Sequence, residues 1–145
     1  MSRLNATAID HVSVLITDVE RSRRFYRDVL GLKEIAKPKA FDFVALWFDL
    51  GGGQTLHLLR KDKPDSISPR HFCLRVPDAQ AARQHFAGLG VATAETTLID
   101  HCDRFFVNDP DGNRIEIIHW LRPYDPAISG AQELDRGPVA TARGS

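Results

Sequence analysis

The sequence has few cysteines and no excess of either charge. Cys73 and Cys102 are the two cysteines among 145 residues, too few for a disulfide framework, and they form no CxxC pair. This usage fits a reducing compartment. Nineteen basic residues balance nineteen acidic ones, so the net charge is +0. Without a basic excess, we expect neither nucleic acid nor an anionic membrane surface as a partner.

Long apolar segments are also missing. No apolar run approaches membrane-spanning length, and the first twenty residues contain no continuous hydrophobic region typical of a signal peptide. We therefore expect a cytoplasmic protein. The composition is 43% hydrophobic and 26% charged, which is enough apolar material for the core of one globular domain.

The chain is predicted to contain two halves with the same order of elements: strand, helix, strand, strand, strand. The first half covers residues 9–60 and the second 70–120, with a lead-in at 1–8, a polar linker at 61–69 and a tail at 121–145. Strands are predicted at residues 9–16, 33–36, 43–50, 54–60, 71–76, 91–95, 103–107 and 114–120, and helices at 18–30 and 78–89.

Polar residues recur at equivalent places in the two halves. His71 lies 60 positions after His11, and Glu116 lies 59 positions after His57. A single-residue deletion between the helix and the last strands reconciles the two spacings. The first and last strand of each half therefore carry a residue of a type that binds metals.

Glu116 stands out because of its surroundings. The turn Asp109-Pro110-Asp111-Gly112 reverses the chain, and the apolar strand that follows places Glu116 in its middle. Alternation along the strand puts Ile115 and Ile117 on one face and Glu116 on the other. A carboxylate there needs a nearby cation, a hydrogen-bond network or a raised pKa.

The strand periodicity predicts one metal site. If the helices cover the apolar face of each half, the opposite concave face holds His11, His57, His71 and Glu116. Two or three imidazoles with a carboxylate are a ligand set for a first-row transition metal, with positions left for exchangeable ligands. A lone strand histidine is more often an ordinary hydrogen-bonded residue, but the repeat favours metal binding at His11, His71 and Glu116. For His57 both interpretations stay open.

A family resemblance is carried by four segments, residues 9–14, 22–32, 54–58 and 108–116. In these segments the chain resembles the vicinal oxygen chelate superfamily, which includes glyoxalases, fosfomycin-resistance proteins and extradiol dioxygenases. The resemblance implies an α+β fold in which two βαβββ modules in tandem form an open, curled mixed sheet. This cup surrounds a divalent metal ion, which could be Fe, Ni, Zn or Mn, and the helices lie outside.

The resemblance also implies site residues and a kind of chemistry. The family metal ligands fall on His11, His71 and Glu116, with a fourth position at His57. Glyoxalases that act on the glutathione hemithioacetal usually carry a carboxylate where this chain has His57, and residues 93–103 lack the lysine expected of fosfomycin-modifying relatives.

We therefore expect a metal-dependent enzyme whose small-molecule substrate chelates the metal through vicinal oxygens. Glu116 would be both a ligand and a possible catalytic proton acceptor. Lyase, isomerase and ring-cleaving dioxygenase chemistry remain open. The alternative is a non-catalytic protein of the bleomycin-resistance type that sequesters a ligand or drug.

We also expect a homodimer. One module presents only half of a cup, so two modules must meet to complete the site. The nine-residue linker at 61–69 allows the modules to pair within a chain or with a partner. Relatives of this length commonly pair with a partner, so the resemblance implies a site shared between subunits. The tail contains several prolines and a short stretch at 131–134 that could form a helix.

Overall fold

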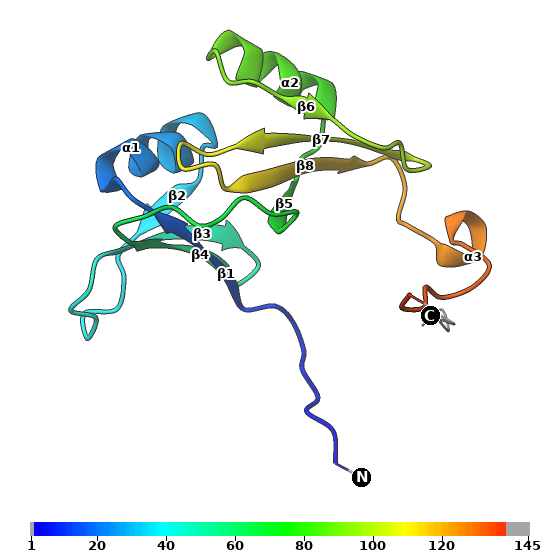
Figure 1. The fold of residues 1–145 in the computed structure, drawn as a ribbon, viewed down its shortest axis with the longest axis horizontal. Coiled ribbons are helices and arrows are strands. Elements are labelled where there is room, and N and C mark those ends of the chain that lie inside the picture. Colours follow the sequence, from blue (N-terminus) through cyan, green and yellow to red (C-terminus); the bar gives the residue numbers. More distant parts are fainter. Residues whose placement is uncertain (1, 139–145) are drawn as a thin grey trace, which may run out of the picture.

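The computed structural model describes residues 2–138 (Figure 1). It contains two separate four-stranded mixed sheets, with strand orders β1-β4-β3-β2 and β5-β8-β7-β6. The predicted α+β fold of tandem modules is confirmed. The strands are β1 (His11–Ile16), β2 (Lys33–Ile35), β3 (Ala45–Gly51), β4 (Gln54–Arg60), β5 (His71–Arg75), β6 (Ala94–Glu95), β7 (Cys102–Asn108) and β8 (Arg114–Trp120).

The register of the parallel pairs reproduces the sequence repeat. Strand β1 runs parallel to β4 and places Ser13 beside His57, while β5 runs parallel to β8 and places Cys73 beside Glu116. Pairing of β1 with β4 begins at His11, so the strand starts two residues later than predicted. The two halves are therefore equivalent in pairing as well as in element order.

The two predicted helices lie on the same side of the sheets (Figure 1). Helix α1 (Val19–Arg23) is capped by the carboxylate of Asp18, and α2 (Ala79–Gly88) by that of Asp78. Each carboxylate accepts a hydrogen bond from a backbone N–H three residues later, which satisfies a donor at the helix start.

The sequence pattern predicts one α-helix over residues 18–30, but only its first part is α-helical. It continues as a π-helical segment, η1 (Arg24–Val29), in which the N–H of Leu30 donates to the carbonyl of Phe25 at 2.9 Å. Phe25 and Tyr26 of this segment are both buried, and the wider turn accompanies this packing, which sequence periodicity does not report.

A single core joins the helices to the sheets. The strand positions predicted to face the helices all belong to it, and the opposite face is left for the polar residues. These strand positions are Val12, Val14, Phe72, Leu74, Ile115 and Ile117.

The turn before β8 fastens the second half to the first. The buried carboxylate of Asp109 accepts a hydrogen bond from the hydroxyl of Tyr26 at 2.8 Å. Within the same turn, the side-chain amide of Asn113 donates to the carbonyl of Leu15 at 2.7 Å, and Thr17 donates to Asp111 from both its backbone and its hydroxyl. The turn predicted from its Asp-Pro-Asp-Gly sequence is therefore also one of the contacts that hold the two halves together.

Tyr26 leads to a prediction about stability at high pH. Burial and then the charge of Asp109 raise the pKa of Tyr26 well above its ordinary value of 10.0. A phenol whose pKa is raised by folding contributes stability that is present below pH 10.0 and is lost above it, because the unfolded chain ionises first. Urea denaturation should show unfolding free energy falling more steeply from about pH 10 to 11.5 in the native sequence than in Tyr26→Phe. Equal slopes would contradict this assignment.

The C-terminal segment contains a short helix in a place that was not predicted. Helix α3 spans Pro126–Ser129 and is capped by Asp125, while residues 131–134 are not helical. A proline at the first helical position and an aspartate before it suit a helix start, which explains the shift. The predicted lead-in and tail also include residues 1 and 139–145, which lie outside the described residues. No helix among residues 2–138 is long and apolar enough to cross a membrane.

Candidate metal site

The better-formed part of the candidate site lies on the second sheet, on the face away from the helices. His71 stands at the start of β5 and Glu116 in the middle of β8. The Nε2 atom of His71 lies 3.3 Å from Oε2 of Glu116. The other ring nitrogen, Nδ1, lies 2.8 Å from the carbonyl oxygen of Pro69. Because a carbonyl only accepts hydrogen bonds, Nδ1 carries the hydrogen.

This pair of atoms suits a cation. In the neutral imidazole, Nε2 presents a lone pair toward a carboxylate oxygen that also carries lone pairs. Such a pair is favourable only if His71 is doubly protonated or if a cation lies between the two atoms. Two ligand atoms about 2.1 Å from a tetrahedral metal ion are about 3.4 Å apart, close to the separation seen here. The residues therefore fit a divalent metal.

The cation expected beside a buried Glu116 carboxylate is Arg104. Oε1 of Glu116 accepts a hydrogen bond from Nη1 of Arg104 at 2.8 Å. Burial alone would raise the pKa of Glu116, but the hydrogen bonds from Arg104 and Cys73 and nearby positive charge outweigh burial and lower it. Glu116 is therefore ionised at neutral pH. Burial, assisted by the charge of Glu116, raises the pKa of the Cys73 thiol to about 12, so Cys73 stays protonated.

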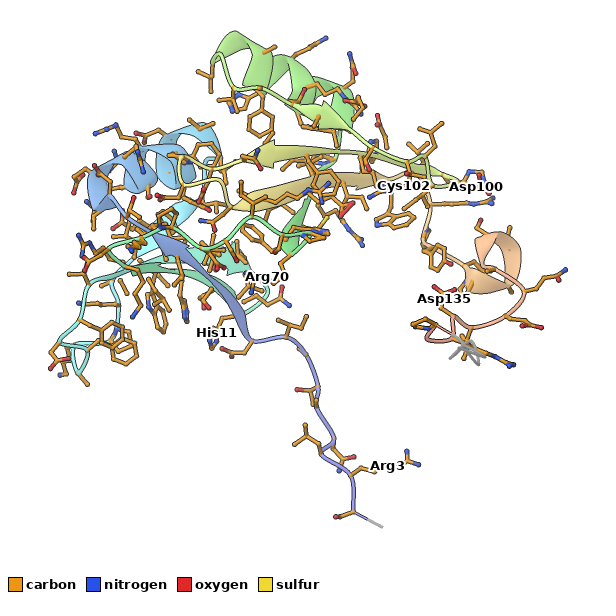
Figure 2. The ribbon with its side chains drawn as sticks, in the orientation of Figure 1. Arg3, His11, Arg70, Asp100, Cys102 and Asp135 are labelled. Atoms are coloured by element: carbon orange, nitrogen blue, oxygen red, sulfur yellow. The ribbon has the colours of Figure 1, made fainter. Side chains whose placement is uncertain are left out.

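The other part of the candidate site lies on the first sheet. Figure 2 shows His11 at the outer end of β1, on the side away from the helices. Its Nδ1 lies 2.7 Å from a carboxylate oxygen of Asp10, an arrangement that leaves Nε2 available to a metal. The ring of His57 is stacked between those of His11 and Trp47, with centroid distances of 4.2 and 3.6 Å. The Nε2 atom of His57 lies 2.8 Å from the hydroxyl of Thr55.

The stacking bears on the role of His57. An imidazole binds a metal along a lone pair in the plane of its ring, and the planes of His11 and His57 differ by only 21°. One ion cannot lie in both of these nearly parallel planes unless a ring rotates. Burial, and then the charge of His11, lowers the pKa of His57, so its ring is neutral at neutral pH.

Within one chain the predicted ligands form two pairs and not one group of four. His71 lies against Glu116, and His11 lies against His57. Within residues 2–138, no three His, Cys, Asp or Glu side chains are placed so that they could hold one metal ion. His11 and Cys73 do line a common cavity of about 320 Å³ between the two sheets.

Three neighbours of the predicted ligands were not identified from the sequence. They are Arg104 beside Glu116, Asp10 beside His11 and the carbonyl of Pro69 beside His71. Arg104 could have been found from strand alternation, since it shares a face of β7 with Phe106, which pairs with Glu116. The other two are local contacts that depend on side-chain rotamers, so no sequence signal identifies them.

The chain is similar to proteins of one family over most of its length. A family model described as the Glyoxalase/Bleomycin resistance protein/Dioxygenase superfamily matches residues 8–117. The chain is 30% identical over 125 residues to Glyoxylase I 4 of Arabidopsis thaliana, covering 79% of this chain and 71% of that one. It is also 30% identical over 126 residues to the uncharacterized protein YaeR of Escherichia coli (strain K12), covering 79% and 97%.

Solved structures show the same fold. A glyoxalase family protein from Bacillus anthracis matches with a TM-score of 0.74 and 28% identity, covering 81% of this chain and 98% of that one. A lactoylglutathione lyase from Agrobacterium tumefaciens matches with a TM-score of 0.65, covering 79% and 95%; at 21% identity this likeness concerns the fold alone.

Proposed function

Since the chain belongs to the Glyoxalase/Bleomycin resistance protein/Dioxygenase superfamily, we propose that it is a divalent-metal-dependent enzyme acting on a small molecule with two neighbouring oxygens. The observation that carries the proposal is the placement of His71 Nε2 and Glu116 Oε2, two metal-binding atoms 3.3 Å apart. His11, whose Nδ1 is held by Asp10, would be the third ligand through Nε2.

The protein groups have separate roles in this proposal. The metal, when bound, would supply Lewis-acid or redox chemistry and accept two substrate oxygens at its open positions. In both His11 and His71, a hydrogen-bond acceptor at Nδ1 would leave the lone pair of Nε2 for the metal. Glu116, ionised at neutral pH, contributes a negative charge and can accept a substrate proton.

We further propose that the complete site forms between two chains. His11 and His57 from one chain would face His71 and Glu116 from a second copy. The separation of these pairs within one chain supports this arrangement. So does the C-terminal segment, which extends away from the two sheets (Figure 1) and carries exposed apolar side chains that a partner subunit could cover. They are Leu121, Tyr124, Ile128 and Leu134.

We expect His57 to be less important for metal binding than the other three residues. His57→Ala should weaken affinity by no more than about tenfold, because its Nε2 is engaged by Thr55 and its ring is stacked on His11. His71→Ala should abolish tight binding. Calorimetric titration with Ni²⁺ measures both variants. Equal losses would make His57 a full ligand.

Metal content tests the proposed function. Purified protein, reconstituted anaerobically with Fe, Ni, Zn or Mn, should hold one ion per chain and gain thermal stability. Saturation at 100 times the dissociation constant corresponds to about 2.7 kcal/mol of stabilisation. Protein that holds no stoichiometric ion and gains no stability with any of the four would contradict the proposal. A substrate screen should follow only for the metal that binds.

A second candidate is a non-catalytic protein that sequesters an aromatic ligand. It is favoured by a group of aromatic rings beside the first half of the site, where Phe41 stacks on Phe43 at 4.8 Å and lies edge-on to Trp47 at 5.9 Å. Phe43 is half exposed, so a ligand could reach it. If metal-free and metal-loaded protein bind an aromatic ligand with the same affinity, this second function is favoured.

A further inference from the structure

We infer that Arg104 is a positioning residue that determines which oxygen of Glu116 is presented to the metal. The inference rests on the proposed metal site and adds to it a residue outside the ligand set. Arg104 lies on β7 and reaches the carboxylate of Glu116 on the neighbouring strand β8. Its side chain is only 16% exposed, so it is not a solvated surface arginine.

The guanidinium group of Arg104 donates hydrogen bonds to two acceptors at once. Nη1 donates to Oε1 of Glu116 at 2.8 Å, and Nη2 donates to the carbonyl oxygen of Thr97 at 2.9 Å. The carbonyl belongs to the backbone between β6 and β7, so it anchors one side of the guanidinium. The other side can then hold Glu116 in one orientation, because the guanidinium is planar and rigid.

The consequence for Glu116 is that its two oxygens are not equivalent. Oε1 is occupied by Arg104, whereas Oε2 is directed at Nε2 of His71. A metal held by His71 and Glu116 would therefore meet Oε2, the oxygen that Arg104 leaves free. Removing a residue that hydrogen-bonds to a metal ligand and orients it typically lowers metal affinity by about 10- to 100-fold.

Arg75 provides a control for the effect of charge alone. Strand alternation puts Arg75 on the same face of β5 as His71 and Cys73, and its side chain is exposed. Among the described residues it makes no hydrogen bond or ion pair with Glu116. Removing Arg75 thus removes one positive charge from this face and leaves the carboxylate in place.

The experiment is a titration with Co²⁺, whose visible absorption reports the number and geometry of its ligands. The variants are Arg104→Met, Arg104→Lys and Arg75→Met, each checked for folding by circular dichroism. We expect Arg104→Met to bind Co²⁺ about 10- to 100-fold more weakly and with an altered spectrum. Arg104→Lys should keep the charge but not restore the spectrum, because an ammonium group cannot hold both acceptors in the same plane. Arg75→Met should match the native protein in spectrum and within about threefold in affinity.

The possible outcomes separate this inference from the proposed function. Unchanged affinity and spectrum in Arg104→Met, or an equal change in Arg75→Met, would overturn the positioning role and leave the metal site intact. Tighter binding by Arg104→Met would also overturn it. If Arg104→Met does not fold, the spectrum of Arg104→Lys decides, since a native spectrum would overturn the inference. If the native protein binds no Co²⁺, the metal site itself fails.

Discussion

Replacing Glu116 by glutamine is expected to weaken metal binding by more than about 100-fold, beyond the effect typical of groups that only orient a ligand. Glutamine has nearly the same shape but no negative charge, so it removes the anionic ligand while preserving the packing. It also leaves Arg104 facing a neutral amide in a mostly buried position, where an unpaired charge is costly. Affinity for Ni²⁺ and Co²⁺, measured by calorimetry, reports the first effect, and chemical denaturation reports the second.

A matched control uses another carboxylate of the same sheet. Asp103 on β7 pairs with Arg83 at 2.7 Å, away from His71. Asp103→Asn therefore removes one carboxylate charge and one ion pair without touching the proposed ligands, and it should retain metal affinity within about threefold. Native affinity in Glu116→Gln would show that Glu116 is not a ligand.

Replacing Asp109 by alanine is expected to cost about 3–5 kcal/mol of unfolding free energy, because it removes several hydrogen bonds to one buried carboxyl group at once. Asp109 is 4% exposed. It accepts hydrogen bonds from the Tyr26 hydroxyl, the backbone N–H groups of Asp111 and Asn113, and the side-chain amide of Asn113. Alanine leaves these donors without their acceptor, and it weakens the contact that fastens the second half of the chain to the first.

Urea denaturation at neutral pH measures this loss. Asp125→Ala, which removes the cap of the exposed helix α3, is the control and should cost about 1 kcal/mol or less. Tyr26→Phe should cost about 1 kcal/mol, because it removes one hydrogen bond and leaves the other three donors satisfied. A loss below about 1 kcal/mol in Asp109→Ala would contradict the role assigned to this network.

The sequence predicts strands and their faces well, because alternation is a local property. The spacing of His11 to His71 and of His57 to Glu116 predicts equivalent positions in two modules, and the strand pairings confirm the equivalence. The apolar faces were predicted for the same reason. The hydrogen bond between Arg104 and Glu116 was not predicted, because strand alternation does not show how far an arginine side chain reaches across the sheet.

The arrangement of the two modules could not be predicted from strand patterns. Alternation shows which face a residue occupies, but not how one sheet is oriented relative to the other. That orientation depends on contacts between distant residues, such as Tyr26 with Asp109 and Asn113 with the carbonyl of Leu15. Sequence periodicity likewise does not distinguish the π-helical continuation of the first helix, where Tyr26 is buried, from an α-helix.

In the proposed dimer, His11 of one chain and Glu116 of another would bind the same metal ion. Mixed dimers of His11→Ala and Glu116→Ala chains test this shared site. Each variant alone should bind no metal tightly, because every site in its homodimer lacks one ligand. In the mixed dimer one site lacks both ligands and the other is complete.

The measurement is the metal content of heterodimers that are purified through two different affinity tags after co-refolding. A shared site predicts one tightly bound ion per heterodimer. No tightly bound ion in a demonstrated heterodimer would contradict the claim and show that each chain must build its site alone.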